Sequence, residues 1–204
     1  VYSLHGEETT YQQAVQEMSA RALAVVCVGT CASFGGIPAS GSNPTGVVGV
    51  SQLTGRATIN VSGCPANPDW VVWTIVQLLT GTPVDLDEDG RPTALYTETI
   101  HGTSKTLIHD KCPRNPYVNA LAPAEATDFA DCDGKCLIQL GCRGPAAKAR
   151  CNGCWNVLAP PANPAPTDRW QNNWCIGVNA PCHGCVEKTF PGPESFYEPY
   201  VPPT

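Results

Sequence analysis

The stretch Leu23-Ala-Val-Val-Cys-Val-Gly-Thr-Cys-Ala-Ser-Phe-Gly-Gly36 decides the fold of this chain. Its first six residues are all apolar and are followed by Gly29, a pattern typical of a strand buried in a parallel sheet. Ala57–Val61 repeats the pattern in shorter form and ends at Ser62-Gly63, which predicts a second strand. Each predicted strand is therefore followed by a loop that carries a glycine and a cysteine.

Two helices are predicted before and after these strands. One covers Thr9–Ala22, with Thr9 or Thr10 as its N-cap. The other opens at Asn67-Pro68-Asp69, where proline suits the first helical turn, and it stops near Gly81. Strands and helices that succeed one another in this way indicate an α/β fold with a doubly wound sheet.

The second half of the chain has a different texture. Regular periodicity fades after Ala122, and residues 158–167 contain four prolines, which indicates an extended loop. Hydrophobic burial alone will not hold such a segment, so something must cross-link it. We therefore predict an α/β domain over residues 1–95 and an irregular, cysteine-rich domain over residues 96–204.

The composition excludes several classes of protein. A formal net charge of -6 over 204 residues argues against a nucleic-acid partner, which would favour a basic surface. Hydrophobic residues make up 42% of the chain, enough for a folded core. No apolar run reaches the roughly 18 residues of a transmembrane helix. Because Val1 is not an initiator methionine, we expect either a removed leader or a fragment.

The twelve cysteines are unevenly placed. Three lie in the first 111 residues and nine lie between Cys112 and Cys185. Disulfide frameworks usually compensate for a poor core, whereas the first half of this chain has a good core and few cysteines. The clustering therefore favours bound metal over disulfides.

Three groups of residues are candidate metal ligands. Cys31 and Cys64 each follow a predicted strand, at the sheet edge where α/β proteins bind ligands, and spacing alone equally allows a pair of loop cysteines. The second group combines one histidine with three cysteines, which suits zinc as readily as iron–sulfur. It comprises His109, Cys112, Cys136 and Cys142.

The third group of candidate ligands begins with C-N-G-C and ends with C-H-G-C, which by itself looks like a zinc ribbon. The 27 residues between these pairs exceed the usual spacing of roughly 15–20, and five cysteines exceed what one zinc ion needs. The group comprises Cys151, Cys154, Cys175, Cys182 and Cys185.

Several motifs together resemble the small subunit of nickel–iron hydrogenases. They are G-T-C-A-S-F-G-G-I, N-P-T-G, G-C-P-A-N-P, H-x-x-C-P-R and C-x5-C-x-G-P, in this order. The resemblance implies a flavodoxin-like parallel-sheet domain followed by an iron–sulfur domain. It also implies that Cys31 and Cys64 bind the proximal 4Fe–4S cluster. In the family, two further ligands come from an N-terminal C-x-x-C motif, which this sequence lacks.

The resemblance assigns the other two groups as well. His109, Cys112, Cys136 and Cys142 match the ligands of the family's distal 4Fe–4S cluster, which lies towards the surface. Cys151, Cys182 and Cys185 match ligands of the medial cluster. Many members have N-W-P where this chain has Asn173-Trp174-Cys175, and their medial cluster is 3Fe–4S. We therefore predict a medial 4Fe–4S cluster with Cys175 as fourth ligand, Cys154 being the alternative; the C-terminal motif resembles the selenium-containing branch.

These resemblances imply an electron-transfer subunit with no catalytic residue of its own. A large subunit would hold the nickel–iron centre for hydrogen oxidation or proton reduction. A cytochrome or another redox carrier would exchange electrons near His109. We expect a periplasmic or membrane-associated protein, with the cytoplasm as alternative. The other interpretations are a subunit of a cofactor-reducing hydrogenase or complex I-like assembly, a zinc-stabilised binding module, and a disulfide-bonded extracellular protein.

The remaining polar and sulfur residues have no predicted metal-binding role. Cys27 lies inside the apolar strand and is expected in the core, and Cys132 is expected to be a free cysteine in a turn. The acidic stretch Asp85–Asp89 is expected to be a solvated loop. Three histidines have no evident ligand partners: His5, His101 and His183.

Overall fold

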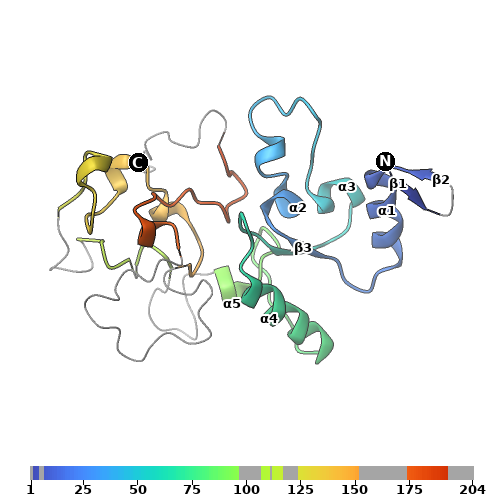
Figure 1. The fold of residues 1–204 in the computed structure, drawn as a ribbon. Helices are drawn as coiled ribbons and strands as arrows, with labels where there is room; N and C mark the ends of the chain where they lie inside the picture. Colours follow the sequence, from blue (N-terminus) through green and yellow to red (C-terminus); the bar gives the residue numbers. More distant parts are fainter. Residues whose placement is uncertain are drawn as a thin grey trace. The chain divides into compact units, whose positions relative to one another are not determined.

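The computed structural model describes residues 2–4, 7–96, 107–110, 112–116, 124–151 and 174–192 (Figure 1). The chain divides into two compact units, Val1–Thr93 and Ala94–Thr204. The first unit contains the strands and the longer helices, and the described part of the second consists mainly of turns and short 3-10 helices. The α/β class predicted for the first part of the chain is confirmed.

The first unit begins with a hairpin and a capped helix. Strands β1 (Tyr2–Leu4) and β2 (Glu7–Thr9) pair antiparallel, a feature too short for sequence patterns to predict. Helix α1 (Tyr11–Arg21) follows, and its N-cap is Thr10. The Gln13 amide donates to Thr10 Oγ1 at 3.1 Å while the Thr10 amide donates to Gln13 Oε1 at 2.9 Å. This capping box satisfies two amides that the helix leaves unpaired, so the predicted helix is confirmed.

The sheet of the first unit is parallel, as predicted. Strands β3 (Val26–Val28) and β4 (Ile59–Val61) pair in parallel with Cys27 opposite Asn60. Cys27 is buried, which confirms its expected place in the core. The apolar run is longer than the strand it contains, because Leu23 lies fully exposed ahead of β3.

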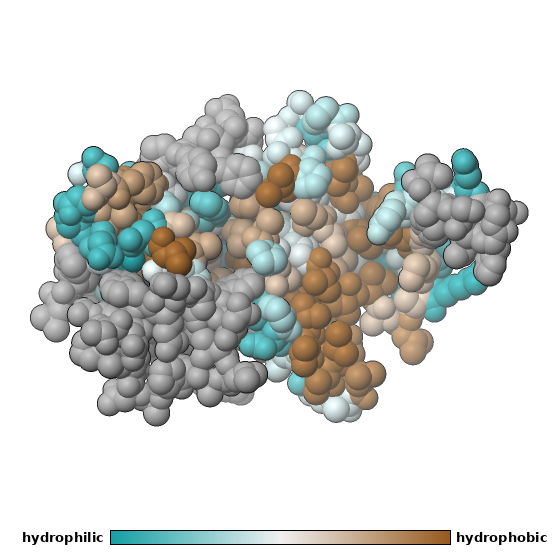
Figure 2. All heavy atoms as spheres, in the orientation of Figure 1, coloured by the Kyte–Doolittle hydropathy of each residue, from teal (hydrophilic) through white to brown (hydrophobic). Residues whose placement is uncertain are grey.

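Helix α4 (Pro68–Leu79) follows β4 and begins where the sequence predicts. Asn67 is its N-cap and accepts a hydrogen bond from the Asp69 amide at 2.9 Å. The inner side of the helix carries the buried Trp70 and Thr74. Its most apolar side faces outward, as the brown surface over α4 in Figure 2 shows. The exposed residues on that side are Val72, Ile75, Val76 and Leu79.

Three short helices complete the regular elements around the sheet. They are α2 (Thr30–Phe34), η1 (Ile37–Ala39) and α3 (Val50–Thr54). Helix α2 starts directly after β3 and packs against both strands. A further short helix, α5 (Thr93–Tyr96), lies at the boundary between the two units.

The acidic stretch after α4 is anchored to the sheet, and the expectation of a merely solvated loop is wrong. Arg91 is fully buried, and its Nε donates to Asp87 Oδ2 at 2.9 Å. The Asn60 amide in β4 donates to the Gly90 carbonyl at 2.8 Å, and the Asn60 side chain donates to the Asp89 carbonyl at 2.7 Å. The carboxylates therefore hold a buried cation, and the loop backbone is fastened against β4.

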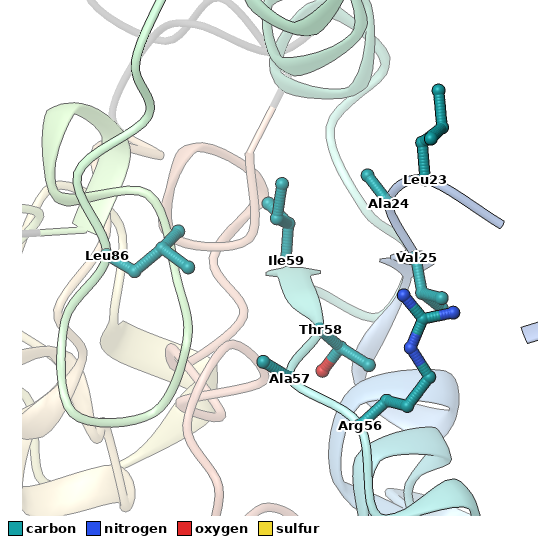
Figure 3. Close-up of a pocket in the computed structure, with 8 residues that line it drawn as sticks. All are labelled: Leu23, Ala24, Val25, Arg56, Ala57, Thr58, Ile59 and Leu86. Carbon is teal, nitrogen blue, oxygen red and sulfur yellow. The ribbon is translucent and has the colours of Figure 1, made fainter. Parts of the chain in front are cut away.

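A cavity of about 360 Å³ lies at the amino ends of the two parallel strands (Figure 3). Because both strands run the same way, this cavity is at the opposite end of the sheet from the two loop cysteines. Arg56 at its rim donates to the Ala22 carbonyl at 3.0 Å. The lining residues are Leu23, Ala24, Val25, Arg56, Ala57, Thr58, Ile59 and Leu86.

The second unit has little regular structure in the ranges described. Its elements are η2 (Phe129–Asp131), η3 (Ile138–Leu140), η4 (Gly144–Ala146) and η5 (Ile176–Val178), with a single parallel bridge between Glu125 and Cys136. Its buried residues include small apolar side chains and five cysteines, namely Cys112, Cys132, Cys136, Cys142 and Cys182. Within the described ranges, no helix combines the length and apolarity needed to cross a bilayer.

Candidate metal-binding site

The carboxyl ends of β3 and β4 bring Cys31 and Cys64 together. The Thr30 amide donates to the Gly63 carbonyl at 3.0 Å, and the Gly63 amide donates to Thr30 Oγ1 at 2.8 Å. Both thiols remain exposed. Partial desolvation raises the pKa of Cys64, and the neighbouring Cys31 raises it further. Two adjacent, exposed thiols at this edge of a parallel sheet could supply two of the four ligands of a thiolate-bound cluster.

A glycine keeps the space beside Cys31 open. Gly36 has φ of 55°, a conformation that glycine adopts readily. A Cβ atom at this position would lie 3.0 Å from Cys31 Sγ and equally close to its amide nitrogen. A side chain at position 36 would therefore crowd the Cys31 thiol.

In the second unit, a tight turn joins His109 to Cys112. The Cys112 amide donates to the His109 carbonyl at 3.3 Å. The Asn115 side chain contacts His109 Nε2 at 3.1 Å and donates to the His109 carbonyl at 3.0 Å. Burial lowers the pKa of His109, with Asp110 acting in the opposite direction. A histidine held neutral and fixed in orientation is suited to bind a metal ion.

Three buried cysteines are associated with this turn: Cys112 at its end, and Cys136 and Cys142 near Cys112. Burial raises the pKa of Cys112 to about 11, and the Cys142 and Cys136 thiols are among the causes that raise it. Burial also raises the pKa of Cys136 and of Cys142. Metal binds the thiolate form, so cluster binding at these thiols would release protons. The structure thus brings together the three cysteines predicted for the distal group.

Two cysteines of the medial group, Cys151 and Cys185, lie near Cys182, whereas Cys175 is exposed. Burial raises the pKa of Cys182 well above its usual range, and the thiols of Cys142, Cys151 and Cys185 add to this. Cys175 also neighbours Cys142, whose pKa it raises. Cys142 is therefore the thiol that connects the two groups. The alternative ligand Cys154 lies outside the described residues.

Four of the predicted ligand thiols share one local geometry. In each, the amide two residues further along the chain donates to the sulfur, and this bond lowers the thiol pKa against the effect of burial. The bond from the Gly184 amide to Cys182 Sγ is 3.4 Å long. Amide donors of this kind stabilise thiolates and tune iron–sulfur clusters. The donor–acceptor pairs are Arg114 with Cys112, Ile138 with Cys136, Gly144 with Cys142, and Gly184 with Cys182.

Neither disulfides nor a compact single-ion site explains the cysteines in the described ranges. All eleven cysteines there are free thiols. Among the same residues, no three His, Cys, Asp or Glu side chains lie close enough to share one metal ion. Four of the thiols instead accept backbone amide hydrogen bonds, which is a feature of the cysteine ligands of iron–sulfur clusters.

Each of the two units matches a different protein family. Residues 4–78 match the family described as NADH ubiquinone oxidoreductase, 20 Kd subunit. Residues 105–198 match the family that describes the C-terminal part of the NiFe/NiFeSe hydrogenase small subunit. The periplasmic [NiFe] hydrogenase small subunit of Solidesulfovibrio fructosivorans is 37% identical over 87% of this chain. The periplasmic [NiFeSe] hydrogenase small subunit of Desulfomicrobium baculatum is 35% identical over 95% of it.

The similarity to hydrogenase small subunits also holds for a solved structure, over nearly the whole chain. A chain of the [NiFeSe] hydrogenase from Desulfovibrio vulgaris Hildenborough superposes with a TM-score of 0.73 at 33% identity, covering 97% of this chain and 68% of that one. The chain belongs to the nickel–iron hydrogenase small subunits. This hydrogenase small-subunit sequence spans about half the length of the curated relatives, 50% and 58% of the two named above. The family predicted from the cysteine motifs is confirmed.

Two buried or partly buried basic residues of this chain were not predicted from the sequence. Arg114 is buried and donates to the carbonyls of Cys132 and Lys135 at 3.3 and 3.5 Å, and to Asn179 Oδ1 at 2.6 Å. Arg143 follows Cys142 and donates to the Pro191 carbonyl at 2.6 Å. Each lies one or two residues after a predicted ligand, in C-P-R and C-R-G-P. This adjacency to a ligand is the sequence feature that could have identified them.

Proposed function

We propose that this protein conducts electrons between a nickel–iron centre in a partner large subunit and an external redox carrier, in an enzyme that oxidises or forms dihydrogen. The observation that carries the proposal is the row of amide donors aimed at four thiols in a chain of this family. Each bound cluster would supply a one-electron redox centre. Relatives named as periplasmic support a periplasmic location.

The ligands of the three clusters are proposed as follows. Cys31 and Cys64 supply half of the proximal site, and their exposure leaves room for two further thiolates. His109, Cys112, Cys136 and Cys142 hold the distal 4Fe–4S cluster. Cys151, Cys175, Cys182 and Cys185 hold the medial 4Fe–4S cluster. The chain itself fixes each centre, excludes water from the buried thiols and sets the surrounding charge.

A complex I-like role is the second candidate. Its support is the match of residues 4–78 to the NADH ubiquinone oxidoreductase family. That match covers only the unit with Cys31 and Cys64. The eight other predicted ligands lie in the region that matches the hydrogenase family, which favours the hydrogenase role.

Metal analysis tests the proposed function directly. Anaerobically purified protein is expected to be brown and to contain iron and acid-labile sulfide in equal amounts, far above zinc. Iron and sulfide are measured colorimetrically on the same sample used for zinc by mass spectrometry. Stoichiometric zinc without sulfide would falsify the proposal and leave the zinc-stabilised module.

The Cys175→Pro substitution tests the nature of the medial cluster. Cys175 has φ of −52°, which lies within the range that the proline ring requires. We expect a medial 3Fe–4S cluster of higher potential, with an electron paramagnetic resonance signal in the oxidised state. Cys175→Ala serves as control and should give the same signal. A medial 4Fe–4S centre that survives both substitutions would instead assign Cys154 as the fourth ligand.

A further inference from the structure

Arg143 joins the two cysteine groups through its backbone. Its amide donates to the Cys182 carbonyl at 2.6 Å, while the Cys182 amide donates to the sulfur of Cys142. The residue that follows a predicted distal ligand is therefore bonded to the backbone of a predicted medial ligand. This arrangement fixes where the Arg143 side chain begins.

The Arg143 side chain then covers the turn between Cys182 and Cys185. A Cβ atom at Gly184 in this turn would lie 3.5 Å from Arg143 Cβ and 3.8 Å from its Cδ. A Cβ atom at Gly192 would lie 3.2 and 3.3 Å from the two terminal nitrogens. The aliphatic stem of Arg143 therefore passes over Gly184, and the guanidinium lies against Pro191 and Gly192, with Nη1 bonded to the Pro191 carbonyl at 2.6 Å.

A positive charge in this position stabilises negative charge on a cluster bound at the Cys182–Cys185 turn. Arginine stays charged at any physiological pH, and its side chain is partly buried here, so solvent screens it less than a surface lysine. Reduction adds one negative charge to an iron–sulfur cluster. A fixed positive charge nearby favours the reduced state and raises the potential.

We propose that Arg143, whose stem packs against Gly184, holds a fixed positive charge near the Cys182–Cys185 turn and raises the reduction potential of the cluster bound there. The proposal rests on the proposed function, because it requires a cluster at this turn. Through its backbone, Arg143 also keeps the two neighbouring cluster sites at a constant separation. The residue thereby makes the medial centre an easier electron acceptor without binding iron itself.

Substitution of Arg143 by methionine tests the charge. In the complete enzyme, Arg143→Met is expected to lower the one-electron reduction equilibrium of the medial cluster about tenfold, a fall of about 59 mV in midpoint potential. Arg143→Lys should keep most of the wild-type potential, because it keeps the charge. Potentials are measured by redox titration followed by electron paramagnetic resonance, which does not depend on turnover.

Lys188→Met is the matched control, since it removes an exposed cation three residues beyond Cys185. Its potential should stay at the wild-type value because water screens that charge. An unchanged potential in Arg143→Met, or an equal fall in Arg143→Lys, overturns the proposal. If Arg143→Met loses iron, Arg143→Gln decides by the same titration, and loss of iron in all three variants assigns Arg143 a structural role only. Wild-type protein without iron and sulfide would refute the proposed function instead.

Discussion

Replacement of Cys142 by alanine is expected to remove about four iron and four sulfide ions per chain, because this buried thiol also holds the backbone of Cys182, so its loss disrupts the whole site and does not merely free one iron position. Cys142 is buried and accepts amide hydrogen bonds from Gly144 and Cys182. It also neighbours thiols of both cysteine groups. The described part of the second unit consists mainly of turns and short helices, so we expect metal binding to supply much of its folding free energy. We therefore also expect loss of the cooperative thermal transition of this unit, measured by calorimetry.

Cys132→Ala is the matched control for this substitution. Cys132 is 4% exposed and Cys142 is 6% exposed, so both substitutions remove a thiol that is equally buried. Because Cys132 is not a predicted ligand, its loss should leave iron and sulfide unchanged and destabilise the protein by about 1 kcal/mol. Equal loss of iron from both variants, or full retention by Cys142→Ala, would contradict the ligand assignment.

Elements with strong local signals were predictable from the sequence. The apolar run before Gly29 predicts β3, and Asn67-Pro68 predicts the start of α4, since each signal lies within a few residues of the element itself. The hairpin β1–β2 has strands of three residues, too short for alternation to be recognised. The outward apolar side of α4 also escaped prediction, because periodicity identifies an apolar stripe but does not tell what covers it.

The sequence predicts which residue types form the candidate site, but it does not predict the amide donors and the buried arginines around them. Cysteine spacing and the family motifs identify the thiols, because ligand type and order are properties of the sequence. The amide donors to Cys112, Cys136, Cys142 and Cys182 depend on backbone dihedral angles, which no spacing fixes. Arginine is rarely buried, so the sequence alone offered no reason to place Arg91 or Arg114 inside.

Arg114→Met should lower the thermal midpoint of the protein by about 10 °C, which corresponds to about 3–5 kcal/mol. Arg114 is 1% exposed, and its guanidinium links its own segment to residues 132–135 and to Asn179 through hydrogen bonds. Burial lowers the pKa of Arg114, and nearby thiols and Asp133 oppose that change, so the cation stays charged. Methionine fills a similar volume but leaves the three oxygen acceptors without this donor. Calorimetry of the iron-loaded protein measures the shift.

Asn179→Gly separates the hydrogen bonds of Arg114 from its volume, because glycine keeps the left-handed backbone at this position, where φ is 62°. It removes the shortest of the three contacts, at 2.6 Å, and should lower the midpoint by about 3–5 °C. The double variant should be no less stable than Arg114→Met alone, since the contact is lost only once. Arg114→Lys keeps the charge but not the planar fork that reaches all three oxygens, so an intermediate midpoint is expected. A midpoint within about 2 °C of wild type in Arg114→Met, roughly the effect of a single surface substitution, would show that this buried cation does not hold the segments together.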